Sequence, residues 1–277
     1  MTADDFGAAP EVNEAVERAH REGIVTAASL MVTGPAMADA VERARRMPSL
    51  RVGLHLVLVD GVPALPQNSV PDLTERSGRF RANMTLAGIN MSFNPAARNQ
   101  LAAEVTAQFE AFRATGLALD HVNGHKHFHV HPAIAKCVLR IGRQFGVRAV
   151  RVPLEPSDVL QRVQPETPVR HQWLLGYFAR SLLRRARRLG IFAPDHVFGI
   201  RWSGAMTRDR LRSLIEALPE GVSEIYCHPA LSGGFPGSAA KYRYAEELAA
   251  LTDSEVVAAA RSTRIRLGAF TDFLPKR

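Results

Sequence analysis

The sequence predicts an α/β fold built on a parallel sheet, because short apolar segments alternate with longer amphipathic ones. Glycine or proline bounds most of the short segments, as is typical of strands. The predicted strands are Ser29–Val32, Arg51–Leu56, Leu117–Val122, Ala149–Val152 and Ser223–Cys227. A chain of 277 residues is long enough for one such domain, either as an open sheet or as a barrel.

Capping signals place helices between these strands. Asn94 followed by Pro95 is a favourable start for a helix that reaches about residue 115. Residues 252–255 form a Thr-x-x-Glu capping box ahead of another helix. Further helical patterns cover residues 133–145 and 207–218.

Two proline-rich stretches depart from this pattern. Residues 57–92 show little periodicity, and residues 153–168 are also irregular. A connection as long as the first is more often functional than passive inside a compact domain. We therefore expect a single domain, residues 1–277, with a long loop at about residues 57–92 that could cover a site.

Composition indicates a protein of a reducing compartment. Cys137 and Cys227 lie far apart, and neither has a second cysteine at metal-ligand spacing. No apolar run approaches the roughly 20 residues of a membrane span. Residues 1–5 lack the charged and apolar regions of a signal peptide. We expect a cytoplasmic protein that is at most peripheral to a membrane.

The chain is basic, with a formal net charge of +8. Nucleic acid, an anionic lipid surface or an acidic substrate would each explain that charge, and so would an arginine-rich proteome. An Arg-rich helix is predicted at about residues 171–190. Such helices often lie on anionic membranes, although a solvated helix packed on a barrel has the same pattern. Its apolar arc comprises Leu175, Phe178, Leu182 and Leu189, and its basic arc comprises Arg180, Arg184, Arg187 and Arg188.

Polar motifs follow the predicted strands, at the edge where parallel α/β folds place their active sites. The first is the pair Asp4-Asp5 ahead of Gly7. Adjacent carboxylates repel each other, so one commonly binds a cation while the other is available as a base. A turn-forming pair is the alternative. The second motif is His55 at the end of an apolar strand, which taken alone is more typical of a core histidine.

The third motif is a run of five histidines between residues 121 and 131. In an extended segment these alternate residues would point the same way. Imidazoles crowded on one face are costly unless something uses them, and metal binding is the commonest use. A carboxylate and two histidines from separate strands would hold a metal and leave positions open for water and substrate. The histidines are His121, His125, His127, His129 and His131.

Two further residues follow late strands. His228 lies just past the strand Ser223–Cys227, where it is well positioned to act as a general acid. A surface histidine before a proline turn is the alternative. Arg151 ends the segment Ala149–Val152, and it could orient Asp4, contact substrate or form a structural salt bridge.

These motifs together resemble the YdjC-type carbohydrate deacetylases along nearly the whole chain. Asn123-Gly124-His125 stands where many members have Asp-Ser-His, and this departure resembles the hopanoid-biosynthesis-associated branch. The resemblance rests on Ala3-Asp4-Asp5-Phe6-Gly7, Gly53-Leu54-His55, His125-Lys126-His127-Phe128-His129 and Cys227-His228-Pro229.

The resemblance implies a distorted (β/α) barrel related to polysaccharide deacetylases. It also implies one divalent metal held by Asp5, His55 and His125, with Asp4 as general base. Ligand softness favours zinc over magnesium for this set. His127 and His129 would tune the ligands from behind or line the substrate groove.

The branch implies removal of acetate from an N-acetylglucosaminyl hopanoid to give the free amine. Family members carry several apolar residues before the Asp-Asp pair, whereas Met1 lies almost on the motif here. We therefore expect a weakened first strand.

Three other functions remain open from the residues alone. The protein could deacetylate soluble N-acetylated oligosaccharides, or the same metal site could hydrolyse a phosphoester, although no second-metal set is evident. A basic nucleic-acid-binding protein would explain the charge but not the histidines. With 7% aromatic residues and no stacking motif, we expect no nucleic-acid partner.

Overall fold

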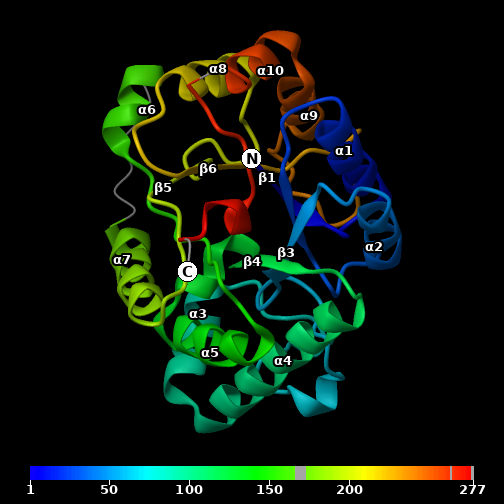
Figure 1. Cartoon of the computed structure of the whole chain (residues 1–277). Helices are drawn as coiled ribbons and strands as arrows, with labels where there is room; N and C mark the ends of the chain where they lie inside the picture. The colour runs from blue at the N-terminus through cyan, green and yellow to red at the C-terminus, as the bar shows by residue number, and fades with distance from the viewer. Residues whose placement is uncertain (166–172, 263, 276–277) are drawn as a thin grey trace.

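The computed structural model describes residues 1–165, 173–262 and 264–275, and within them six strands form one parallel sheet (Figure 1). The strand order is β4-β3-β2-β1-β6-β5, and every paired neighbour is parallel. The sheet therefore places the carboxyl ends of all its strands along one edge. The strands are β1 (Thr2–Phe6), β2 (Ala27–Leu30), β3 (Arg51–Leu56), β4 (Leu119–Gly124), β5 (His196–Phe198) and β6 (Ser223–Cys227).

The sheet curls towards a barrel, and an extended segment at residues 149–154 bridges its two outer strands. On one side the Arg151 N–H donates to the Val122 carbonyl of β4, at 3.0 Å. On the other side the Val197 N–H of β5 donates to the Leu154 carbonyl, also at 3.0 Å. Few ladder bonds form along this segment, so the barrel is distorted, as the family resemblance implies.

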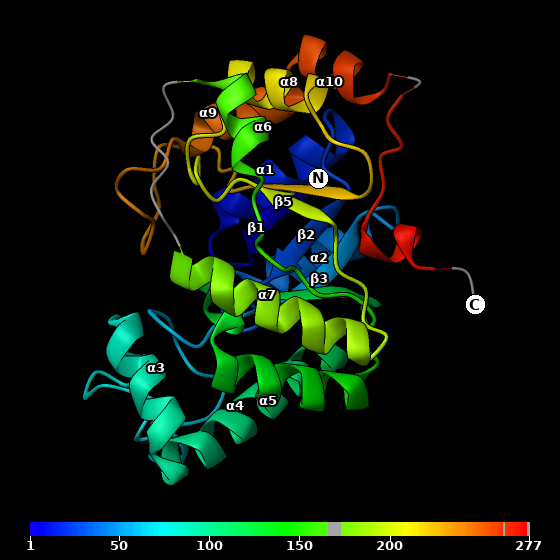
Figure 2. The ribbon, with the colours of Figure 1, turned by 90° about the vertical axis from the view of Figure 1, so that its left-hand side faces the viewer.

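Helices surround this sheet (Figure 1), and α5 and α7 run alongside each other on one side of it (Figure 2). Their inward-facing side chains complete a core in which Phe6, Leu30 and Leu54 are fully buried. Among the described residues, no helix combines the length and hydropathy needed to cross a membrane. The α-helices are α1 (Pro10–Arg21), α2 (Met37–Arg45), α3 (Met84–Phe93), α4 (Pro95–Ala114), α5 (Pro132–Gly142), α6 (Ser157–Val163), α7 (Trp173–Arg188), α8 (Arg208–Glu216), α9 (Tyr244–Thr252) and α10 (Ser254–Ala260).

Several predicted elements are confirmed. β3 and β6 have the predicted bounds, and Asn94 caps α4 by accepting a hydrogen bond from the Ala96 N–H. β1 was not among the predicted strands, yet it pairs along both edges. We expected a weakened first strand, but β1 pairs with both β2 and β6.

Four expectations need correction. The stretch at residues 57–92 is not irregular throughout, because α3 begins at Met84, and α6 occupies part of the second irregular stretch. The segment Ala149–Val152 forms isolated bridges instead of a regular strand. Asp253, not Thr252, caps α10, since its carboxylate accepts from two backbone N–H groups at the helix start.

The Arg-rich helix is α7, and it packs on α5. Ala179, Leu182 and Ala186 are buried on its inner side, as an amphipathic helix on a barrel requires. Leu189 lies beyond the helix end and is 38% exposed, so its placement on the apolar arc was wrong. The first two residues predicted for this helix, 171 and 172, lie outside the described residues.

The carboxylate of Asp120 anchors the C-terminal segment to the sheet. It accepts hydrogen bonds from the Thr271 N–H and hydroxyl and from the ring of His121. Burial on its own would raise the pKa of Asp120, but the bonds from His121 and Thr271 outweigh burial and lower it to about 2.

Replacing Asp120 with asparagine is expected to lower the free energy of unfolding at pH 7 by about 2 kcal/mol. The folded-state pKa lies below the unfolded value, so this stability is present above about pH 4 and is lost as the pH falls towards 2. Denaturant unfolding of both proteins across that range measures the difference.

The matched control is Asp209→Asn, whose side chain is 88% exposed and which should change stability by no more than about 0.5 kcal/mol. A difference between Asp120→Asn and the parent that does not vary with pH would contradict the assignment.

Candidate active site

A bulge at the end of β1 brings two adjacent carboxylates to one place. Ala3 pairs with Ala28 and Phe6 with Leu30, so β1 uses one more residue than β2 over this interval. Neighbouring side chains on a regular strand point to opposite faces, and a bulge re-aims one of them. Asp5 accordingly has a left-handed backbone, with φ at 61°. Such backbones are uncommon outside glycine and concentrate at functional sites.

Asp5 meets two histidines from neighbouring strand ends. His55 Nε2 and His125 Nδ1 each lie 3.3 Å from Asp5 Oδ1. His55 is the penultimate residue of β3, and His125 directly follows β4. Asp5 Oδ1 is buried, and no hydrogen bond satisfies it. One carboxylate oxygen and two imidazole nitrogens that converge in this way form a ligand set that suits a divalent metal.

Asn123 fixes which nitrogen of His55 faces this cluster. The Asn123 amide nitrogen donates to Asp4 Oδ1 and to the Ser29 hydroxyl, so its oxygen is left to accept from His55 Nδ1 at 2.7 Å. His55 Nδ1 therefore carries a hydrogen, which leaves Nε2 as the nitrogen that faces Asp5 and can bind a metal. Metal-binding histidines are oriented by the same kind of bond from their other ring nitrogen.

The histidine run is not extended, which corrects the prediction that five rings share a face. β4 ends at Gly124, and a short 3-10 segment follows at His125–Val130. Lys126 and His127 have positive φ values of 54° and 55°, so the chain turns sharply after His125. His121 instead lies in the strand and is fully buried. The turn brings His125 to Asp5 and sends the later rings elsewhere.

Asp4, the predicted base, forms a bidentate salt bridge with a buried guanidinium. Arg151 Nη1 and Nη2 donate to the two oxygens of Asp4 at 2.5 and 3.0 Å. Arg151 also donates to Glu224 from Nε and Nη2, and it lies over the ring of Tyr226 at 4.4 Å. Arg151 is 0% exposed and forms salt bridges with Asp4 and Glu224, so the structure supports the salt-bridge role and is consistent with orienting Asp4, and it disfavours contact with substrate.

This salt bridge keeps Asp4 ionised. Burial would raise the pKa of Asp4, but Arg151 and His55 outweigh burial and hold it well below its usual value. Burial alone would lower the pKa of His55, but the carboxylates of Asp4 and Asp5 raise it. This part of the molecule is therefore an environment that favours positive charge.

His127 and His129 lie behind the ligand set. His127 Nε2 is 2.8 Å from the Tyr226 hydroxyl, and burial lowers its pKa well below the ordinary value. His129 Nε2 donates to the Arg151 carbonyl at 2.9 Å, which holds the backbone of the residue that grips Asp4. Neither ring belongs to the group formed by Asp5, His55 and His125.

His228 stands just past β6, as the sequence predicts. Its backbone N–H donates to Glu247, and its ring lies 5.6 Å from that of Tyr226 and 5.0 Å from that of Tyr242. Its Nδ1 atom is buried without a hydrogen-bond partner. The ring is close enough to act electrostatically on both Asp4 and Asp5.

The polar chain behind Asn123 is a feature that sequence reasoning missed. Asp120 accepts from His121 Nδ1, His121 Nε2 lies 3.0 Å from the Ser29 hydroxyl, and Ser29 accepts from Asn123. A Cβ on Gly53 would lie 2.5 Å from the His121 ring, so glycine is required where that ring crosses β3. The only sequence signal was the departure at Asn123, which was noted without a role.

The chain is similar to proteins of known description along its whole length. The carbohydrate deacetylase of Brevibacillus brevis is 31% identical over 98% of this chain and 98% of its own length. That of Geobacillus stearothermophilus is 30% identical over 99% and 96%. The carbohydrate deacetylase of Mus musculus is 32% identical over 85% and 77%.

A solved structure shares the fold. A protein of Enterococcus faecalis, described as a cellobiose-phosphate cleavage protein, superposes with a TM-score of 0.76 over 99% of this chain and 97% of its own. Its sequence identity is 24%, so this likeness bears on the fold alone. The family model for YdjC-like proteins matches residues 1–262, a range that contains all of the residues described at the site. The chain therefore belongs to the YdjC-like family.

Proposed function

We propose that the protein is a metal-dependent amide hydrolase that removes the N-acetyl group from a carbohydrate. The observation that carries the proposal is the convergence of Asp5, His55 and His125 beside an ionised Asp4. The relatives named carbohydrate deacetylases support the same reaction class. The three residues would hold one divalent ion, most suitably zinc, which polarises the acyl carbonyl and makes water more acidic.

The protein's own residues would supply the proton transfers. Asp4 accepts a proton from the attacking water, and Arg151 keeps the Asp4 carboxylate charged and correctly turned for that step. Because Arg151 lowers the pKa of Asp4, the Asp4 carboxylate is a weak base. A bound metal ion would compensate by making the water more acidic. His228 protonates the departing amine, which is a poor leaving group without a proton.

Within this reaction class we propose an N-acetylglucosaminyl hopanoid lipid as the substrate, giving the free amine. The proposal rests on the sequence from Asn123 to His125, which resembles the hopanoid-associated branch. A lipid-linked substrate would also require peripheral contact with a membrane. Soluble N-acetylated oligosaccharides are the alternative.

A direct comparison of the two substrates tests this choice. Metal-loaded protein is expected to release amine from an N-acetylglucosaminyl lipid and to act less well on soluble chito-oligosaccharide. Activity on the oligosaccharide alone would keep the reaction and change the substrate. Silence on both, with metal demonstrably bound, would contradict the deacetylase proposal.

Removing the metal is expected to abolish amine release, and adding zinc back should restore it. Asp5→Asn removes the one anionic ligand of the set, so its metal affinity should fall by more than about 100-fold. Metal content by elemental analysis and competition with a chelator measure the loss. Asp158→Asn is the matched control, because its side chain is 78% exposed and remote in sequence from the three residues. Full metal affinity in Asp5→Asn would exclude Asp5 as a ligand.

Asp4→Asn is expected to keep its metal and to lose about 10²–10⁴-fold in turnover, which is the usual contribution of a general base. The amide preserves the size of the side chain while removing the proton acceptor. Parallel metal analysis and thermal unfolding distinguish a lost base from a lost site. Near-normal turnover in this variant would remove Asp4 from the chemical step.

A further inference from the structure

We propose that the face formed by α3, α5 and α7 docks the protein on an anionic lipid bilayer, with the active site at the edge of that face. The proposal rests on the proposed function only in assigning a purpose to the contact. The binding itself follows from charge and exposed apolar surface, and it can be measured without any substrate.

The helices α5 and α7 of this face are unusually rich in cations. α5, the 3-10 turn that follows it at Arg143–Phe145, and α7 contain eight cations and no acidic residue. Their number equals the formal net charge of +8, so the remaining residues are balanced overall. α3 contains no charged residue of either sign. The eight cations are Lys136, Arg140, Arg143, Arg180, Arg184, Arg185, Arg187 and Arg188.

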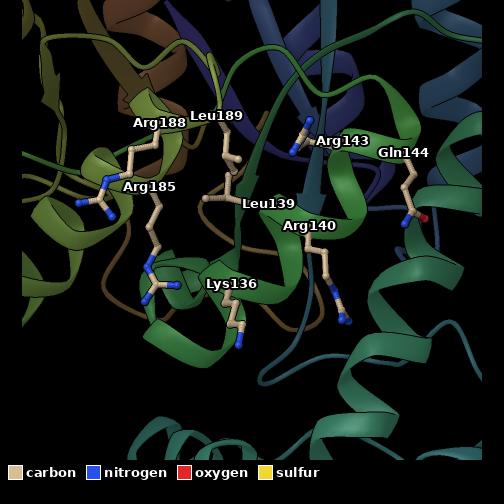
Figure 3. Close-up of a pocket in the computed structure, with 8 residues that line it drawn as sticks. All are labelled: Lys136, Leu139, Arg140, Arg143, Gln144, Arg185, Arg188 and Leu189. Carbon is tan, nitrogen blue, oxygen red and sulfur yellow. The ribbon is translucent and has the colours of Figure 1, made fainter.

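A groove of about 660 Å³ runs along the contact between α5 and α7 and is lined by five of these cations (Figure 3). No ion pair within the described residues engages any of the five. The helix dipole favours cations near the C-terminus of each helix. It does not explain why α3, α5 and α7 all lack acidic residues. Phosphate groups are the natural counter-charge for such a groove. Its lining comprises Lys136, Arg140, Arg143, Arg185 and Arg188, together with Leu139, Gln144 and Leu189.

The same side of α7 is apolar at its other end. Leu174 and Tyr177 are 47% and 60% exposed, and helical spacing of three and four residues places them in line with Arg185 and Arg188. One helix face therefore presents apolar side chains near its N-terminus and cations near its C-terminus.

α3 adds a second exposed apolar stripe. Leu86, Ile89 and Phe93 are 58%, 52% and 80% exposed, and their spacing puts them on one side of the helix. The opposite side packs inward through Ala87, Gly88 and Met91. Of the eight large hydrophobic side chains that the described residues leave exposed, six lie on α3, on α7 or directly after α7. Such clustering marks a contact surface.

The two helices that carry these apolar stripes both contact His131. A Cβ on Gly88 of α3 would lie 2.9 Å from the ring of His131, and the ring of Phe178 of α7 lies 5.8 Å from it. His131 immediately follows the 3-10 segment that begins at the candidate ligand His125. The exposed apolar side chains thus belong to two helices that both pack against His131, and α7 also packs on the 3-10 segment that begins at His125.

A bilayer accounts for both kinds of surface at once. Its phosphate groups match the cations of the groove, and its acyl region takes the apolar side chains of α3 and α7. A nucleic-acid duplex offers phosphates but no apolar medium for Leu86 and Ile89. A second copy of this chain would bring the same eight cations against themselves, which is unfavourable.

Flotation of the full, metal-loaded chain with vesicles tests the proposal. We expect binding to phosphatidylcholine vesicles that contain phosphatidylglycerol, and much weaker binding to phosphatidylcholine alone. Arg185→Gln combined with Arg188→Gln should weaken binding to the anionic vesicles roughly 30-fold, from about fivefold for each cation. Phe93→Ser should weaken the binding that persists at high salt, when the charges are screened.

The matched control removes the same charge from another surface. Arg18→Gln with Arg46→Gln also lowers the net charge by two, at side chains that are 53% and 51% exposed, on α1 and directly after α2. This pair should bind vesicles like the parent. If both pairs weaken binding equally, only net charge matters and the docking face is refuted. If the protein binds duplex DNA and no vesicle, the proposal that this face docks on a bilayer is refuted.

Hydrolysis of a soluble N-acetylated sugar separates this proposal from the proposed function. None of the five substituted residues touches the candidate ligands, so all variants should keep the activity of the parent towards it. Deacetylation without vesicle binding would overturn the docking face and leave the enzyme assignment intact. Vesicle binding without deacetylation of any acetylated sugar would overturn the enzyme assignment and leave the docking face intact.

Discussion

The fully buried guanidinium of Arg151 is the interaction on which the site depends. It is anchored to Asp4 of β1 and Glu224 of β6, while its own backbone pairs with β4 and carries the bond from His129. A charge in this position is tolerated only because both carboxylates and the ring of Tyr226 replace water around it. Losing one partner would leave an uncompensated buried charge. The segment that closes the barrel and the orientation of Asp4 are therefore held by the same group.

The polarity of the hydrogen bonds behind the site is also determined. The bonds run from Asp120 through His121, Ser29 and Asn123 to His55, so the hydrogen on His55 Nδ1 follows from a carboxylate near the start of β4. Ser29, His121 and Asp120 have the connectivity of a hydrolytic triad. Ser29 and His121 are both 0% exposed, and the Ser29 oxygen already accepts from Asn123, so this set positions and does not react.

Sequence reasoning predicted the parallel fold and the groups that meet at the site, because strand ends such as His55 and His228 are marked by short apolar runs before them. It failed where the backbone leaves regular geometry. The bulge at Asp4-Asp5 and the left-handed turn at Lys126 and His127 have no periodic signature, so the histidines were wrongly aligned on one face. The role of Asn123 was also out of reach, since its partners are 68 or more residues away in the chain.

The uneven distribution of charge makes one side of the molecule positive. With the rest of the chain neutral overall, its positive pole coincides with α5 and α7. In any field that falls off over a Debye length of about 8 Å, a torque turns this pole towards the negative side before contact is made. A cation-exchange resin or a carboxylated sensor chip would align the protein in the same way. Retention on the resin and the activity of the protein on the chip would therefore depend on this one side of the molecule and not on its isoelectric point.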